Sequence, residues 1–273
     1  MSLNINEQNI IYFNFAKKLF SNYNILQITN ELSNNFLNLS LEYNLKFPAD
    51  KDIRTLYNEM INKYYHNEIT IKSNFINNVL LKSKNHVTIF EFNLENSRAD
   101  LCKVNGKSIA FEIKTDLDNF FRLEKQVRDY SEVFEEVYVI CSKVNIHNVL
   151  SLIPHFCGIY SYSISQNGDY KFKKEKKSTR SNNFNCLSQL KLLTKKELKN
   201  TFSKFNNIDD KEELINTITN TYSSSYINST FKKIIKQRYN SQWEFLRENH
   251  NQIYEIDYQW FFKNNINPNI IYQ

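Results

Sequence analysis

"RADLCKVNGKSIAFEIK", residues 98–114, predicts the hairpin on which the fold depends. Both halves alternate apolar and polar residues, as half-buried strands do, and an Asn-Gly pair between them favours a turn. A two-residue loop would put Asp100 and Glu112 on opposite faces, whereas a three-residue loop, with Lys103 opposite Lys107, would put them on one face. Only the longer loop gathers the apolar side chains on the other face. We therefore predict a polar face that carries four charged residues: Arg98, Asp100, Glu112 and Lys114.

The segments around this hairpin predict an α/β fold. Residues 86–94 alternate like a further strand, and residues 137–141 form the short apolar run typical of a strand covered on both faces. Between the hairpin and that run, apolar residues of 120–134 recur at steps of three and four, which predicts a helix. Strand, helix and buried strand make a βαβ unit with a right-handed crossover. Residues 158–174 predict one more hairpin.

Helical periodicity flanks this strand-rich region. It is present in residues 1–47, in a segment that begins near Asp52, and from Leu187 onward, apart from a serine-rich loop expected near 221–230. We accordingly divide the chain into three parts: an N-terminal helical segment at 1–48, a core at 49–182 and a C-terminal helical accessory domain at 183–273.

The composition indicates a folded protein of the cell interior. Of 273 residues, 41% are hydrophobic, which is enough to bury a core and excludes general disorder. The four cysteines show no metal-binding spacing, so buried, reduced thiols are expected. Because the sequence shows neither a signal-peptide pattern nor a long apolar run, we expect a soluble cytoplasmic protein without a membrane partner. The net charge of +6 suits a polyanionic partner without requiring one.

The polar face of the hairpin indicates either a solvated sheet surface or a functional site. A solvated surface is the commoner case for a hairpin, but the helix and buried strand that follow imply that this sheet is covered. Asp100 and Glu112 would repel each other in a covered site unless a cation or a proton intervenes. Oxygen ligands without Cys or His favour Mg²⁺ or Mn²⁺. Lys114 shares their face and can hold a water or stabilise charge on a phosphate.

The same residues resemble the PD-(D/E)XK signature of the restriction-endonuclease-like superfamily, with Asp100 followed by Glu112-Ile113-Lys114. More narrowly, three motifs look like those of a family of bacterial and phage proteins within it: "NSRADL" (96–101), "FEIKTD" (111–116) and "RLEKQ" (122–126). The resemblance covers roughly residues 50–180. Thr115 stands where relatives often carry serine, a change that keeps the hydroxyl.

The resemblance implies a restriction-endonuclease-like core with αβββαβ order and a metal-dependent nuclease. On this basis, Asp100, Glu112 and the backbone carbonyl of Ile113 would bind Mg²⁺ or Mn²⁺, and Lys114 would position the attacking water. Gln126 matches the auxiliary glutamine of the superfamily. The implied substrate is nucleic acid, with DNA favoured by analogy alone.

The resemblance also calls for an acidic residue upstream of the hairpin, which would add a further catalytic and metal-binding carboxylate. We select Glu91, with Glu95 and Glu59 as alternatives. Asp116 is a further ligand, a partner of Lys114, or the N-cap of a helix that begins near Leu117.

A further group of side chains is assigned to the surroundings of the ligands. Tyr130 is expected beside them. Substrate contacts are expected from five residues: Arg98, Thr115, Arg122, Lys173 and Lys174. The last two belong to a basic run, 171–180, that either contacts phosphates or forms a solvated strand edge.

Two other functions compete with a DNA nuclease. One is a non-catalytic module that binds nucleic acid or protein on the same fold. The other is a toxin or defence effector that cleaves RNA. A homodimer is considered in each case.

Overall fold

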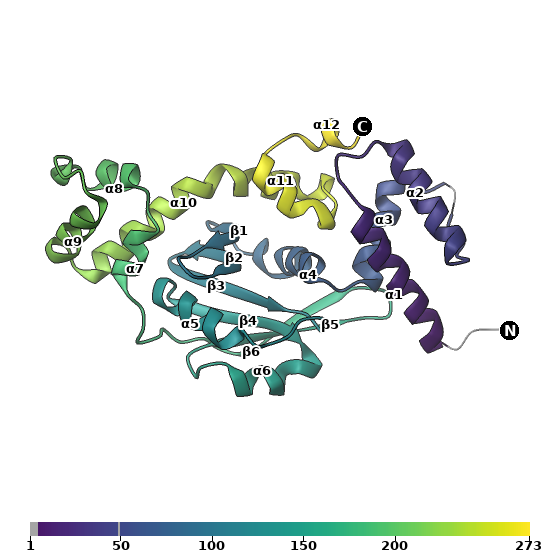
Figure 1. Ribbon diagram of the computed structural model, residues 1–273, viewed down its shortest axis with the longest axis horizontal. Coiled ribbons are helices and arrows are strands. Elements are labelled where there is room, and N and C mark those ends of the chain that lie inside the picture. The colour runs from purple at the N-terminus through teal and green to yellow at the C-terminus, as the bar shows by residue number, and fades with distance from the viewer. Residues whose placement is uncertain (1–4, 49) are drawn as a thin grey trace.

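The computed structural model describes residues 5–48 and 50–273, and it shows an α/β protein with one mixed sheet flanked by helices (Figure 1). The six strands lie in the sheet in chain order. They are β1 (Val87–Asn93), β2 (Arg98–Asn105), β3 (Lys107–Lys114), β4 (Glu136–Ser142), β5 (Gly158–Ile164) and β6 (Tyr170–Lys176). β1, β2 and β3 are antiparallel, β3, β4 and β5 are parallel, and β6 is antiparallel to β5.

The β2–β3 hairpin keeps the predicted faces but not the predicted register. Lys103 lies opposite Ile109 instead of Lys107, and Asn105 lies opposite Lys107, so that Gly106 alone lies between the paired residues. Gly106 has φ +40°, a conformation that glycine adopts without steric cost. A shift of two residues leaves every side chain on its face, because the side-chain period of a strand is two. Asp100 therefore shares a face with Glu112, as predicted.

The β3–β4 crossover also follows the prediction. The helix between these parallel strands is α5 (Leu123–Val133), and every residue of β4 is buried. A second crossover through α6 (Ile146–Leu152) places β5 parallel to β4, and the predicted second hairpin is formed by β5 and β6. α5 lies over the polar face, where its Tyr130 reaches Glu112.

Helices before the sheet cover one end of the molecule and continue, with α4, onto the sheet (Figure 1). They are α1 (Ile5–Asn22), α2 (Thr29–Glu42), α3 (Ile53–Tyr64) and α4 (Glu68–Phe75), which continues as a π-helical turn, η1 (Ile76–Leu80). Asp52 is the N-cap of α3, which agrees with the prediction that a helix begins near this residue. The Phe75 ring of α4 packs on Phe111 at 5.1 Å, on the apolar face of the sheet.

Further helices follow the sheet in the chain. They are α7 (Cys186–Lys191), α8 (Lys195–Thr201), α9 (Lys211–Thr221), α10 (Ser224–Asn249), α11 (Tyr258–Asn264) and α12 (Pro268–Ile271). α10 packs against β1. The loop expected near 221–230 is wrong: Ser223 is the N-cap of α10 and accepts a hydrogen bond from Tyr226 N at 3.3 Å. Serines suit caps as well as loops, which explains the error.

One hydrophobic core joins the sheet to the helices on its β1 side. Buried residues of the strands share it with Phe231 and Trp243 of α10, while Phe15, Phe36 and Tyr57 belong to a second, smaller cluster among α1–α3. The predicted boundary between 182 and 183 therefore separates strands and helices that share one core, and the division of the chain into three parts stays a prediction. All four cysteines are free and buried, as predicted. Within the described residues, no helix has the length and apolarity that crossing a bilayer would require.

Asp257 links the two ends of the chain. Its Oδ2 accepts hydrogen bonds from the hydroxyls of Tyr23, at 2.9 Å, and Tyr272, at 2.8 Å. Burial raises the pKa of Asp257 from 3.8 to about 6, although these hydroxyls and Arg54 oppose the rise.

The raised pKa of Asp257 predicts a pH-dependent stability. A carboxyl whose folded pKa is raised stabilises the fold below its unfolded pKa, and this stabilisation is lost as the pH rises through the folded pKa. The free energy of unfolding should therefore fall between about pH 4 and 6, by up to about 3 kcal/mol at 1.36 kcal/mol per pKa unit. Urea unfolding at several pH values should show that this slope is smaller in Asp257→Asn. An unchanged slope would contradict the assignment.

Candidate functional site

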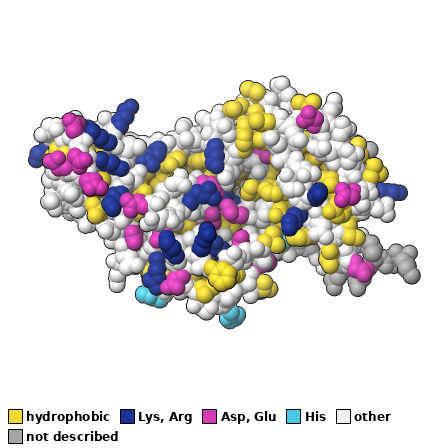
Figure 2. All heavy atoms as spheres, viewed as in Figure 1, with side chains coloured by type: hydrophobic (Ala, Val, Ile, Leu, Met, Phe, Trp, Pro, Cys, Tyr) yellow, Lys and Arg dark blue, Asp and Glu magenta, His cyan; other side chains and the backbone are white. Residues whose placement is uncertain are grey.

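A cleft of about 610 Å³ opens between β2, β3, α5 and the N-terminal end of α4. Most of the predicted site residues line it: Arg98, Asp100, Glu112, Ile113, Lys114, Arg122 and Gln126. Glu68, Lys125 and Asp129 line it as well. Figure 2 shows acidic and basic side chains gathered next to one another in the middle of this face of the molecule. The sheet and α5 therefore bring residues of three sequence motifs into one place.

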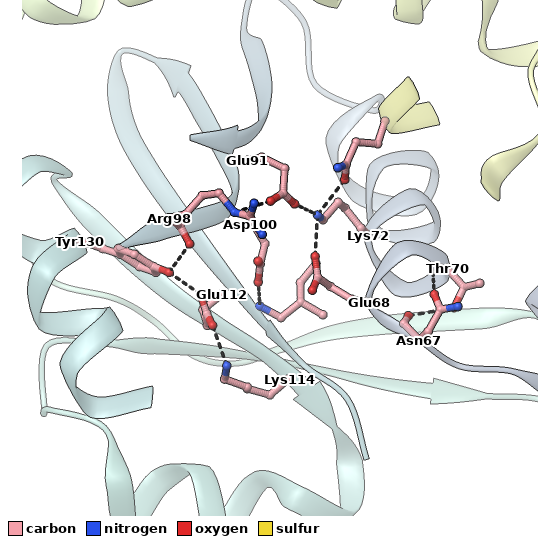
Figure 3. Close-up of polar contacts among 12 residues, drawn as sticks. Asn67, Glu68, Thr70, Lys72, Glu91, Arg98, Asp100, Glu112, Lys114 and Tyr130 are labelled. Carbon is pink, nitrogen blue, oxygen red and sulfur yellow. Dashed lines mark hydrogen bonds and ion pairs between the residues drawn. The ribbon is translucent and has the colours of Figure 1, made fainter. Parts of the chain in front are cut away.

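Glu112 is the most tightly held carboxylate of the cleft. Its side chain is 2% exposed, and its Oε1 accepts a hydrogen bond from the Lys114 ammonium at 2.7 Å (Figure 3). Its Oε2 lies 2.5 Å from the Tyr130 hydroxyl, as expected for a residue beside the ligands. Lys114 also donates to Gln126 Oε1 at 3.1 Å. Burial raises the pKa of Glu112, while Lys114 and Tyr130 act against that rise.

Asp100 is buried on the same face, and its Oδ2 accepts the backbone N–H of Ile113 at 2.6 Å. Burial raises the pKa of Asp100 well above its usual value, and the charges of Glu112 and Glu68 raise it further. Lys72 and the Ile113 N–H act against the rise. A buried carboxylate beside others favours a bound proton or cation. This donor set, oxygen only, fits a hard divalent ion such as Mg²⁺ or Mn²⁺.

Glu91 reaches the same region from β1 (Figure 3). Its Oε2 lies 2.5 Å from Arg98 Nε, and its other oxygen pairs with Lys72. Glu91 has φ +54°, a conformation that is rare for residues other than glycine and is often found at functional sites. Carboxylate oxygens of Glu68, Glu91 and Asp100 all lie within 4.8 Å of one another.

The sequence reasoning missed Glu68 and Lys72, both of which come from α4. Asn67 caps this helix by accepting a hydrogen bond from Thr70 N at 3.0 Å. An Asn followed directly by an acidic residue is a helix-start signal, so a second helix after α3 was detectable. Such a signal does not show that its acidic residue points into a site.

The two alternatives to Glu91 lie elsewhere. Glu59 pairs with Lys51 at 2.7 Å on the surface, and Glu95 lies 3.6 Å from Lys191. Neither belongs to the cluster of carboxylates that Glu91 forms with Glu68 and Asp100.

Asp116 lies outside the cleft, away from its expected place beside the ligands. It accepts hydrogen bonds from Oγ of Ser142, the last residue of β4, and from Asn145 Nδ2 just after it. The helix expected near Leu117 begins at Leu123, so Asp116 is not its N-cap.

Three of the predicted substrate contacts lie outside the cleft. Thr115 is buried, and its hydroxyl accepts the N–H of Leu117 at 3.0 Å, so it holds the turn after β3. Lys173 pairs with Glu175 at 2.8 Å, and the Lys174 ammonium lies over the rings of Tyr138 and Tyr160. Lys173 and Lys174 lie on β6, and their contact with a substrate stays a prediction.

Comparisons with known proteins place the chain in a phage family. One curated relative, Protein cII of Enterobacteria phage P4, is 32% identical over 108 residues, which are 40% of this chain and 40% of that protein. A solved structure, the SPO1766 protein of unknown function from Silicibacter pomeroyi, aligns with a TM-score of 0.30 and 13% identity over 40% of this chain and 70% of its own. That structural likeness is too low to support an argument. The family model for bacteriophage P4 protein cII matches residues 62–259, which include every residue that lines the cleft. The chain therefore belongs to the bacteriophage P4 protein cII family.

Proposed function

We propose that this protein is a divalent-metal-dependent nuclease built on a restriction-endonuclease-like core. The observation that carries the proposal is the convergence of Asp100, Glu112 and Lys114 in one cleft, with both carboxylates buried. The order of elements supports it, since α4 is followed by three antiparallel strands, a helix and a strand parallel to the third. A solvated hairpin face would leave such charges exposed to water.

The cleft offers a site for the ion that this chemistry requires. Asp100, Glu112 and the carbonyl of Ile113 would hold Mg²⁺ or Mn²⁺, which when bound neutralises charge on a phosphate and acidifies a water. Lys114 lies where it can orient the attacking water, and Gln126 holds its ammonium at 3.1 Å. Tyr130 fixes the second oxygen of Glu112.

Cationic side chains at the rim suit a phosphate backbone. Arg98 is exposed, its side chain 58% accessible, although its guanidinium also pairs with Glu91. Arg122, at the N-cap of α5, and Lys125, on α5, are exposed along the same cleft. Such groups bind phosphates without reading the base sequence. DNA is the substrate we favour, on the analogy with the superfamily.

A cleavage assay tests the function. The protein is incubated with plasmid, single-stranded DNA and RNA, each in Mg²⁺, Mn²⁺ or EDTA. We expect cleavage of DNA in either metal and none in EDTA. Cleavage that persists in EDTA would contradict the metal-dependent mechanism, and cleavage of RNA alone would favour the toxin or defence effector. Binding without cleavage of any substrate would favour the non-catalytic module.

A further inference from the structure

A buried lysine lies inside the cluster of carboxylates. The side chain of Lys72 is 1% exposed, and its ammonium donates to Glu68 Oε1 at 2.8 Å, to Glu91 and to Gln259 Oε1 of α11 at 3.1 Å (Figure 3). Oxygens of Glu68, Glu91 and Asp100 lie within 4.8 Å of one another. Three carboxylates this close attract a divalent cation when no other positive charge is present. The ammonium of Lys72 provides such a charge.

Asp100 belongs to two groups of charges at once. Glu112 and Lys114 of β3 lie on the same face of the sheet as Asp100. The Asp100 carboxylate also lies beside those of Glu68 and Glu91, which surround Lys72. The Lys72 ammonium lies between the carboxylates of Glu68 and Glu91 and donates hydrogen bonds to both. Unlike a metal ion, this charge is covalently attached and does not exchange with solvent.

We propose that Lys72 supplies the second positive charge of this site, so that the chain binds one divalent ion, at Asp100 and Glu112, where two would otherwise bind. The inference rests on the metal site of the proposed function, but it concerns the number of ions and not cleavage. Lys72 does not line the cleft, so it is a positioning residue. It orients Glu68 and Glu91 and reduces the repulsion around Asp100.

Counting bound ions tests the proposal. In equilibrium dialysis with Mn²⁺, the wild-type chain should bind one ion and Lys72→Met should bind two. The variant removes the ammonium that Glu68 and Glu91 share, and it leaves the exposed Arg98, paired with Glu91, as the remaining cation beside the three carboxylates. Mn²⁺ should also raise the Tm of Lys72→Met by more than it raises that of the wild type. Two ions on the wild type, or no additional ion on Lys72→Met, would overturn the proposal.

Two further variants serve as controls. Lys125→Met removes an exposed cation that lines the same cleft and pairs with Asp129, and it should leave the count at one. Glu68→Gln keeps Lys72 and should also bind one ion, so it gives an answer even where Lys72→Met does not fold. Loss of the ion in Glu68→Gln would show that the wild-type ion sits in the Glu68 cluster, which would refute the proposal. Because no nucleic acid is present, the ion counts and the cleavage assay can fail separately.

Discussion

Asp100→Asn is expected to lose cleavage activity by roughly 10³-fold while remaining at least as stable as the wild type. The amide retains an oxygen that can accept the Ile113 N–H, but it removes a charge needed to hold the ion. The raised pKa of Asp100 means that its ionised form destabilises the fold. The protonated carboxyl of Asp100 stabilises the fold below its unfolded pKa, and this stabilisation is lost as the pH rises through its folded pKa. Thermal unfolding in EDTA at pH 7 measures this, and an active or less stable variant would contradict it.

Lys114 provides the contrasting variant. Lys114→Met should also lose activity, by roughly 10²-fold, but it leaves Glu112 buried without its ion pair, which typically costs about 3–5 kcal/mol. Asp129→Asn is the matched control, since Asp129 lines the same cleft and only pairs with the exposed Lys125. It should retain both activity and stability. The two variants should thus both lose activity but with opposite effects on stability, because ionised Asp100 destabilises the fold whereas Lys114 neutralises a buried carboxylate.

The faces of the central hairpin were predictable because a strand has a simple period. Alternation assigns Asp100 and Glu112 to one side, and any even error in register preserves that result. The register itself was not predictable, since it depends on the backbone of Gly106 and a shift of two residues leaves the apolar pattern unchanged. The local sequence therefore predicted which side chains share a face of the sheet more reliably than which residues lie opposite each other across the two strands.

The α4 part of the site escaped prediction for a different reason. Charged residues on a helix are normally assigned to solvent, because burial of an unpaired charge is costly. Lys72 is buried only because Glu68, Glu91 and Gln259 satisfy its ammonium, and Glu91 and Gln259 come from β1 and α11, distant in the sequence. Glu91 was selected from the resemblance, and its positive φ has no signature in a single sequence. Such residues become visible only when the tertiary contacts are known.

The second large effect concerns the helices after residue 182. Trp243→Ala is expected to lower the free energy of unfolding by about 3–5 kcal/mol, because this side chain of α10 is fully buried. Its ring lies 4.9 Å from the ring of His86, which directly precedes β1. Urea unfolding monitored by circular dichroism measures the loss. Tyr226→Ala, on the same helix but 49% exposed, should cost less than about 1 kcal/mol.

The same variant tests whether residues 183–273 fold separately from the sheet. Trp260 is then the single remaining tryptophan, and its fluorescence reports on α11 while circular dichroism reports on the whole chain. Because α10 and the strands share one core, we expect the two signals to change at the same urea concentration. Separate transitions would show an independent accessory domain. A single transition means that α11 helps to hold Glu68, a carboxylate of the cleft, since Lys72 donates hydrogen bonds to both Gln259 of α11 and Glu68.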